Sequence, residues 1–259
     1  MSRRIINLSS SSKKQIKGCI EVPGDKSISH RAIIISSIAK GKTKIYNYLD
    51  SEDVNATITA CMAMGVHIEK DNESLIIDGN NLSRISGDDV EFNFGNSGTS
   101  MRLMMGVLSA QNISSVLLGD ESLNQRPMDR ISKPLIKMNA DIKTSNDTPP
   151  VSITPVKKII NVDHYEEIAS AQIKSSILLA GLYGEDELSI KTPPSRDHTE
   201  IMLREFNCNI FNDSDSIKMK PSRLQSPETI NIPGDLSSAA FFIVGAILAK
   251  DSEVTVKNI

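Results

Sequence analysis

Several short stretches place cationic and hydroxyl side chains at the start of an apolar, helix-like run. In PGDKSISHRA, Lys26, Ser27 and Arg31 precede such a run. A helix N-terminus leaves backbone N–H groups without partners and carries a positive partial charge, so it favours anions. A lone serine there is more often a simple cap. The added Lys and Arg point instead to a site for phosphate or carboxylate groups.

Similar starts occur further along the chain. GNSGTSMR carries Arg102, SAQIK carries Lys174, and two arginines beside prolines, Arg126 and Arg196, lie in turn-like contexts. Gly98 lets a ligand approach the backbone closely. The motifs GxxxxGK[ST], GxGxxG and GxSxG are absent, so the sequence favours neither a nucleotide-hydrolysing P-loop, nor a dinucleotide fold, nor a hydrolase elbow.

Composition excludes several classes of function. The net charge is −3 and aromatic residues make up 4% with no Trp, which disfavours a nucleic-acid-binding protein. The histidines and cysteines lack metal-ligand spacing, so no metal is expected. Neither a signal peptide nor a membrane-spanning run is apparent. Cys19, Cys61 and Cys208 are expected to be free, buried thiols in a reducing compartment, which predicts a cytoplasmic protein.

The elements that position these residues recur along the chain. Four segments share a turn, small polar residues and an apolar run, and their starts lie roughly 65–75 residues apart. They predict helices over 24–41, 95–111, 170–184 and 234–251. Further helices are predicted over 51–65, 128–140 and 195–207. Strands are predicted over 43–49, 74–79, 91–95, 115–119, 151–154, 187–191 and 228–234, and loops over 144–150 and 212–216.

This order indicates a repeated unit of strand–helix–strand–helix–strand–strand, three of which fit residues 17–230. Residues 232–250 (IPGDLSSAAFFIVGAILAK) repeat residues 22–40 at an offset of 210 residues, without the Lys, the His and the Arg. An offset of three units predicts that a second triplet begins near residue 232.

Six ordered motifs carry a resemblance to a known family. PGDKSISHRA, GNSGTSMRLM, LNQRPMDR, ASAQIKSSILLAGL, SRDHTEIML and IPGDLSSAAF resemble the 5-enolpyruvylshikimate-3-phosphate (EPSP) synthase family, over essentially the whole chain. The resemblance implies an α/β fold with an inside-out domain of three βαβαββ units, followed by the start of a second such domain. The boundaries expected are 1–16 for a segment associated with the second domain, 17–230 for the first domain, and 231–259 for the incomplete start of the second.

The resemblance also implies a reaction. Members of the family transfer the enolpyruvyl group of phosphoenolpyruvate to the 5-hydroxyl of shikimate 3-phosphate and release phosphate, by addition and elimination, without metal or organic cofactor. This is a step of aromatic amino-acid biosynthesis. The partners implied are these two small anions, with no nucleic acid and no membrane, and the full-length protein is expected to be a monomer.

The family's site residues map onto this sequence motif by motif. Lys26 is expected to contact both substrates and to stabilise charge in the transition state. The shikimate 3-phosphate side is assigned to Ser27, Arg31, Ser170, Ala171, Gln172 and Arg196, with Ser195 a weaker candidate. The phosphoenolpyruvate side is assigned to Asn96, Gly98, Arg126 and Gln172. Because Gly98 lies against that pocket, inhibition by glyphosate is expected, and Gly98→Ala is expected to weaken it.

The family's second domain supplies an acidic proton acceptor, a Lys–Glu pair and two further arginines, for which residues 1–259 have no counterpart. We therefore expect this chain alone to bind anions weakly and not to turn over. Two alternatives stay open. One is a UDP-N-acetylglucosamine enolpyruvyl transferase, which has a Lys–Asn pair where this chain has Lys26 and Ser27, and a reactive Cys. The other is a non-enzymatic anion-binding remnant.

Overall fold

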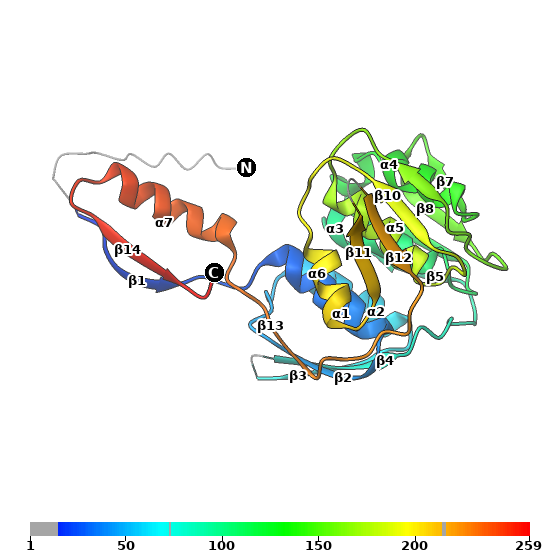
Figure 1. Cartoon of the computed structure of the whole chain (residues 1–259), viewed down its shortest axis with the longest axis horizontal. Helices are drawn as coiled ribbons and strands as arrows, with labels where there is room; N and C mark the ends of the chain where they lie inside the picture. The colour runs from blue at the N-terminus through cyan, green and yellow to red at the C-terminus, as the bar shows by residue number, and fades with distance from the viewer. Residues whose placement is uncertain (1–14, 73, 214–215) are drawn as a thin grey trace. The chain divides into compact units, whose positions relative to one another are not determined.

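The computed structural model describes residues 15–72, 74–213 and 216–259. Within these ranges lie seven α-helices, one short 3-10 helix and fourteen strands (Figure 1). The chain folds into two compact units. Unit 1 comprises the chain up to Asp25 together with Pro233–Ile259, and unit 2 comprises Lys26–Ile232.

Unit 2 is built from three four-stranded sheets of the same design. Their strand orders are β5-β6-β8-β7, β9-β10-β12-β11 and β13-β2-β4-β3. In each sheet the first two strands are parallel, and the third strand is antiparallel to both of its neighbours. The strands are β2 (Lys40–Tyr46), β3 (His67–Asp71), β4 (Ser74–Asn80), β5 (Val90–Asn93), β6 (Ser115–Leu118), β7 (Asp141–Ser145), β8 (Thr148–Thr154), β9 (Asp163–Tyr165), β10 (Leu188–Lys191), β11 (Asn209–Asp213), β12 (Ser216–Lys220) and β13 (Thr229–Asn231). The predicted inside-out α/β fold of repeated βαβαββ units is confirmed.

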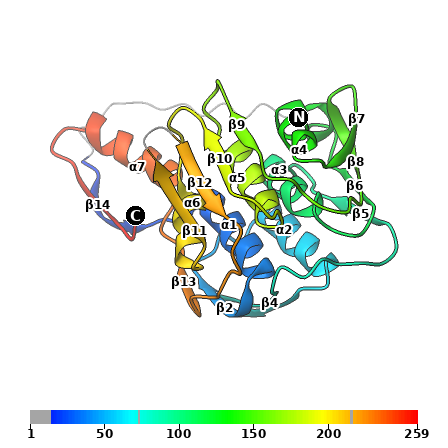
Figure 2. The ribbon, with the colours of Figure 1, turned by 45° about the vertical axis from the view of Figure 1, so that its right-hand side comes forward.

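The helices complete the units. They are α1 (Lys26–Ile38), α2 (Glu52–Ala63), α3 (Gly98–Leu108), α4 (Asp129–Lys137), α5 (Ala171–Gly181) and α6 (His198–Glu205), with the 3-10 helix η1 at Leu123–Gln125. Each α-helix lies within a predicted helical segment, with its ends trimmed by a few residues. Figure 2 shows α1, α3 and α5 surrounded by the three sheets.

The core of unit 2 forms around α1, α3 and α5. These helices are buried on nearly every side, so none has a separate polar face, and even His30, Arg31 and Lys174 lie in the interior. At Gly106 in α3 an added Cβ would lie 2.2 Å from the carbonyl oxygen of Ser176 in α5, so glycine is what lets the two helices approach this closely.

The strand at the start of the chain does not join the first sheet of unit 2. β1 (Lys17–Glu21) pairs in parallel with β14 (Glu253–Lys257) in unit 1, and β13 pairs with β2 instead. The sequence-based division placed residue 17 at the start of the first domain. The edge of β2 is already occupied, because Lys40 N donates to Leu224 O and Lys44 N donates to Glu228 O, at 2.9 and 2.8 Å.

Unit 1 contains β1, β14 and α7 (Leu236–Leu248). Ala239 is the one buried residue of α7 among those described, while Phe241, Ile247 and Leu248 are exposed. Asp235 caps the helix by accepting a hydrogen bond from Ser237 N at 2.8 Å.

Three sequence-based expectations need correction. Residues 144–150 form the end of β7, a two-residue turn and the start of β8 rather than a loop, because Asn146 and Asp147 adopt φ of 52° and 62° and reverse the chain. In the predicted loop 212–216, Asn212 and Asp213 belong to β11 and Ser216 begins β12, while residues 214–215 are outside the described ranges. Cys19 is exposed, because β1 presents most of its side chains to solvent, whereas Cys61 and Cys208 are buried as predicted. Among the described residues no helix is long and apolar enough to cross a membrane.

Candidate active site

The first turns of three helices meet at a pocket of about 360 Å³ in unit 2. Ser27 comes from α1, Thr99 from α3, and Ala171 and Gln172 from α5, while the loop before α6 supplies Arg196. The remaining lining residues are Arg31, Ala169, Ser170, Pro194 and Ser195. None of the described residues that line the pocket carries a carboxylate. Convergent helix N-termini and two arginines make this a place for an anion.

Local sequence explains why helices begin here. Ser97 and Ser170 are N-caps, since their hydroxyls accept hydrogen bonds from Ser100 N and Ile173 N, each at 3.3 Å. Ser51 caps α2 in the same way. A capped start fixes the direction of the first turn and so fixes where its remaining N–H groups point.

Arg31 joins three helices across the floor of the pocket. It is 4% exposed. Its Nε donates to Thr199 Oγ1 of α6 at 2.7 Å, its Nη2 to Ser175 Oγ of α5 at 2.9 Å, and its Nη1 to Ser27 O at 2.9 Å. Ser175 and Thr199 also bond each other at 2.6 Å. Arg31 therefore positions the pocket walls besides lining the pocket.

A second link between α5 and α6 lies close to the first. Lys174 Nζ and Glu200 Oε1 form an ion pair of 2.5 Å, with side chains 4% and 3% exposed. Lys174 was expected to be a cation near a ligand. The structure corrects this, because Glu200 neutralises the ammonium in the interior.

Gln172 is oriented by neighbours on two sides. Its Oε1 accepts from Arg102 Nη1 at 2.7 Å, and its Nε2 donates to Thr99 Oγ1 at 3.0 Å. These bonds fix the orientation of the side-chain amide, with its oxygen toward Arg102 and its nitrogen toward Thr99. On the opposite wall Arg196 Nη1 donates to Ser27 Oγ at 3.4 Å, which brings together two residues from distant motifs.

Asn96, Gly98 and Arg126 form a neighbouring cluster that does not line the pocket. Arg126 Nη2 donates to Asn96 Oδ1, and Asn96 Nδ2 donates to Asp120 Oδ2 at 2.7 Å. A Cβ added at Gly98 would lie 3.2 Å from Arg126 Nη1 and 3.7 Å from Arg102 Nη1. Two guanidinium groups thus face the backbone at Gly98.

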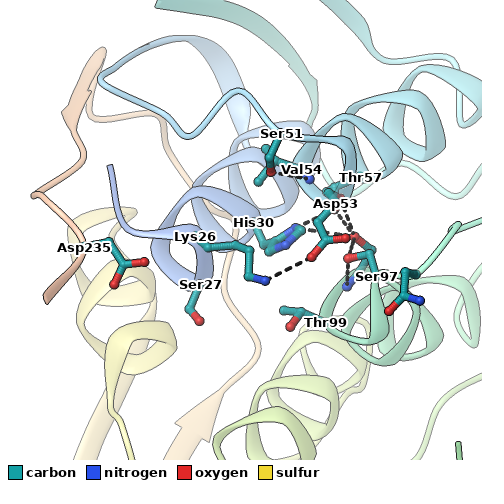
Figure 3. A network of polar contacts seen from close by, with 12 residues as sticks. Lys26, Ser27, His30, Ser51, Asp53, Val54, Thr57, Ser97, Thr99 and Asp235 are labelled. Carbon is teal, nitrogen blue, oxygen red and sulfur yellow. Dashed lines mark hydrogen bonds and ion pairs between the residues drawn. The ribbon is translucent and has the colours of Figure 1, made fainter. Parts of the chain in front are cut away.

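Lys26 lies at the start of α1, outside the pocket lining, and its ammonium is held by Asp53 of α2 (Figure 3). The Nζ–Oδ2 distance is 3.0 Å, and the side chains are 48% and 29% exposed. A half-exposed lysine with one carboxylate partner stays within reach of a ligand.

A buried chain of hydroxyl groups runs behind Lys26. His30 Nδ1 contacts Thr57 Oγ1 at 2.7 Å, Thr57 contacts Ser100 Oγ at 2.6 Å, and Ser97 contacts the same Ser100 oxygen at 2.7 Å (Figure 3). Burial lowers the pKa of His30 to about 4, so its imidazole is neutral near pH 7. The chain ties α1 and α2 to the first turn of α3 without adding charge.

Comparison with known proteins now bears on this arrangement. A family model described as EPSP synthase (3-phosphoshikimate 1-carboxyvinyltransferase) matches residues 11–259. The chain belongs to the EPSP synthase family.

Relatives and a solved structure agree. A 3-phosphoshikimate 1-carboxyvinyltransferase of Legionella pneumophila (strain Lens) is 47% identical over 246 residues, which is 94% of this chain and 57% of the relative. One of Geotalea uraniireducens (strain Rf4) is 43% identical over 95% of this chain and 58% of the relative. An EPSP synthase structure from Acinetobacter baumannii is 44% identical, with a TM-score of 0.85, covering 95% of this chain and 56% of that one. The chain therefore spans less than two thirds of the length of these relatives.

Within the EPSP synthase family motifs, the sequence-predicted residues fall into two groups. Ser27, Arg31, Ser170, Ala171, Gln172 and Arg196 line the one pocket. Lys26, Asn96, Gly98 and Arg126 lie outside its lining. Sequence reasoning missed Asp53, Thr199 and Ser175. Asp53 and Thr199 are side chains of predicted helix starts, but nothing in the sequence indicates that they bond Lys26 and Arg31.

The alternative family considered above, UDP-N-acetylglucosamine enolpyruvyl transferase, has a reactive Cys, so the reactivity of the two buried thiols is informative. Burial raises the pKa of Cys61 and of Cys208 to about 11. A thiol of this kind is mostly protonated at neutral pH and is a poor nucleophile. Among the described residues, no group of three or more His, Cys, Asp or Glu side chains could hold a metal.

Proposed function

We propose that this chain forms the part of an EPSP synthase active site that binds shikimate 3-phosphate and the phosphate end of phosphoenolpyruvate. The reaction is transfer of the enolpyruvyl group to the 5-hydroxyl of shikimate 3-phosphate, with release of phosphate. The observation that carries the proposal is the pocket at which the first turns of α1, α3 and α5 meet Arg31 and Arg196.

Shikimate 3-phosphate is assigned to this pocket. Its phosphate suits the N-terminal turn of α5 and Arg196, since backbone N–H groups and a guanidinium both bind phosphate oxygens. Ser27, Ser170 and Gln172 supply hydrogen bonds to the phosphate or to ring hydroxyls, and Ala171 supplies its backbone. Arg31 contributes mainly by holding these walls in place, since three of its N–H groups already bond protein atoms.

Phosphoenolpyruvate is assigned to the neighbouring cluster of Asn96, Gly98 and Arg126, on the other side of Gln172. Lys26 serves both substrates. Its ammonium moves from Asp53 toward the reacting anions and stabilises negative charge as the tetrahedral intermediate forms. Asp53 is a positioning residue that holds this ammonium in place before the substrates arrive.

The reaction is proposed for a protein that also carries the family's second domain, since the acidic proton acceptor belongs there. In this view unit 2 is the first three-unit domain, and unit 1 is the part of the second domain that this chain contributes. The setting proposed is a cytoplasmic monomer acting on small anions without cofactor, which the buried free thiols Cys61 and Cys208 support.

A chimera tests the proposal directly. The chain is joined to the remaining C-terminal length of the Legionella pneumophila relative, and phosphate release is measured with phosphoenolpyruvate and either shikimate 3-phosphate or UDP-N-acetylglucosamine. We expect release with shikimate 3-phosphate alone. Lys26→Met should lower it by a factor of about 100 or more. The 259-residue chain without the added part should release none.

A folded chimera that releases no phosphate with shikimate 3-phosphate would contradict the proposed reaction. Release with UDP-N-acetylglucosamine instead would establish the rival transferase. Folding is checked by circular dichroism and by the elution volume in size-exclusion chromatography, which also tests the monomer.

The same chimera tests the environment of Gly98. A methyl at this position would lie 3.2 Å from Arg126 Nη1, so this guanidinium would have to shift by a few tenths of an ångström. We expect Gly98→Ala to raise the inhibition constant of glyphosate, an analogue of phosphoenolpyruvate, by about tenfold or more, corresponding to about 1.4 kcal/mol. An unchanged constant would place the phosphoenolpyruvate site elsewhere.

A further inference from the structure

A smaller pocket of about 230 Å³ shares a wall with the shikimate 3-phosphate pocket. Ser170 and Gln172 line both. On the far side the smaller pocket is bounded by Arg102 and Arg130, over an apolar floor that includes Ile131 and Ile173. Arg130 ends the LNQRPMDR motif and lies in the first turn of α4, but the family mapping assigns it no role.

The charges around this pocket are unbalanced. Arg102 donates to Gln172 Oε1 and, at 3.3 Å, to Pro127 O. Its pKa is lowered by burial and by the nearby charges of Arg126 and Arg130. The carboxylate closest in sequence, that of Asp129, pairs with Lys133 at 2.9 Å and also interacts with the charge of Arg130, so it is shared between two cations. An anion placed here would relieve repulsion among three cations.

We propose that Arg102 and Arg130 form a subsite for a small free oxyanion, inorganic phosphate, beside the shikimate 3-phosphate pocket. This inference rests on the proposed function, because phosphate is the product that the reaction releases. Two guanidinium groups offer paired N–H donors to phosphate oxygens, and the pocket is smaller than the one assigned to the substrate.

The subsite is coupled to the main pocket through one side chain. Arg102 bonds Gln172, and Gln172 bonds Thr99 in the main pocket. Phosphate bound to Arg102 draws its guanidinium away from Gln172 Oε1 and leaves the amide free to turn. Phosphate held in this subsite is thus separated from the reacting groups, yet it changes the position of Gln172, which lines both pockets.

The test is a phosphate titration of the ¹⁵N-labelled 259-residue chain. The Arg126→Gln variant serves as background, because it removes phosphate binding near Asn96 and Gly98. The readout is the chemical shifts of the Ile131 and Ile173 amides. We expect saturable shifts at both amides, and Arg130→Gln should raise the dissociation constant by about tenfold. The control Lys137→Gln removes an exposed cation from the other end of α4 and should change the constant by less than about twofold.

Two results would overturn the subsite. One is that Arg130→Gln leaves the dissociation constant of phosphate unchanged, or that Lys137→Gln raises it as much as Arg130→Gln does. Either result would indicate that phosphate is attracted by the general positive charge and not by a defined site. The other is loss of these shifts when shikimate 3-phosphate is added first, which would assign the pocket to the substrate's own phosphate. A failure of the proposed function would give a different result: shikimate 3-phosphate would not bind, while phosphate would still change the chemical shifts of the Ile131 and Ile173 amides.

Discussion

Helices α1 and α7 start from nearly the same sequence, and the difference between them shows what the shared residues encode. Both follow a Pro-Gly-Asp turn, and the two turns bond each other reciprocally: Asp25 N donates to Pro233 O and Asp235 N donates to Pro23 O, each at 2.8 Å. Yet ten residues of α1 are buried, against one described residue of α7. Arg31 is 4% exposed, whereas Phe241, 210 residues later, is 83% exposed.

The repeated residues therefore specify a turn and a helix start, while the residues that differ specify chemistry. Lys26, His30 and Arg31 correspond to Leu236, Ala240 and Phe241. In α1 each of the three has a partner on another element: Asp53 for Lys26, Thr57 for His30, and Ser175 with Thr199 for Arg31. The two helix starts therefore differ in the contacts that their side chains make with other elements rather than in the turn itself.

The largest expected effect is the difference in the free energy of unfolding between variants at Arg31 and at Phe241. Arg31→Met should lower the free energy of unfolding by about 4 kcal/mol, because three charge-assisted hydrogen bonds between helices are lost in the interior. Phe241→Ser should change it by less than about 0.5 kcal/mol, because the ring is exposed. Urea denaturation followed by circular dichroism measures both. Similar decreases in the free energy of unfolding for the two variants would contradict the difference drawn between α1 and α7.

The next effect is the dependence of stability on pH that His30 causes. The corresponding residue of α7 is Ala240. The pKa of His30 is about 4 in the folded chain against 6.5 for the free side chain. Between these values the unfolded chain binds more protons, so stability falls as the pH decreases from about 6.5 toward 4, by about 3 kcal/mol in all. His164, with a pKa lowered mainly by burial to about 4, acts in the same sense.

His30→Asn should therefore flatten the dependence of stability on pH in this range, as measured by urea denaturation at several pH values. The matched control is His67→Asn, which replaces an exposed histidine and so separates the effect of burial from that of the substitution itself. An identical slope in wild type and His30→Asn would mean that His30 is not held neutral by burial.

The smallest effect tests what the two helix starts share. Asp235→Ala removes the side-chain cap of α7, which accepts from Ser237 N at 2.8 Å. The cost should be about 1 kcal/mol. Hydrogen exchange at the amides of residues 237–240 should accelerate by about fivefold, while α1 is unaffected. Unchanged exchange would show that the turn alone holds this helix start.

Much of the fold could be predicted because its pattern is local. A cap followed by an apolar run marks α1, α3, α5 and α7, and their spacing indicates the repeat. Strands such as β3 (HIEKD) and β9 (DHY) were not predicted, because each places a single residue in the core and so shows little apolar pattern. The pairing of β13 with β2 joins segments about 185 residues apart, beyond the reach of any local rule.

The site divides in the same way. The motifs grouped Ser27, Arg31 and Gln172, which do line one pocket, but the partners of these residues could not be predicted. Arg31 depends on partners 144 and 168 residues away. Lys174 has the same motif context as a ligand residue, yet Glu200 on another helix removes it from that role. Charge pairing across the interior leaves no trace in the spacing of residues along the chain.

The most direct test of the central claim is calorimetric titration of the 259-residue chain with shikimate 3-phosphate and, separately, with shikimate. Two guanidinium groups and three helix N-termini should make binding depend on the phosphate. We predict measurable binding of shikimate 3-phosphate, none of shikimate, and a loss of about tenfold or more in Arg196→Gln, or about 1.4 kcal/mol. Equal heats for the two compounds, or full affinity in Arg196→Gln, would contradict the account.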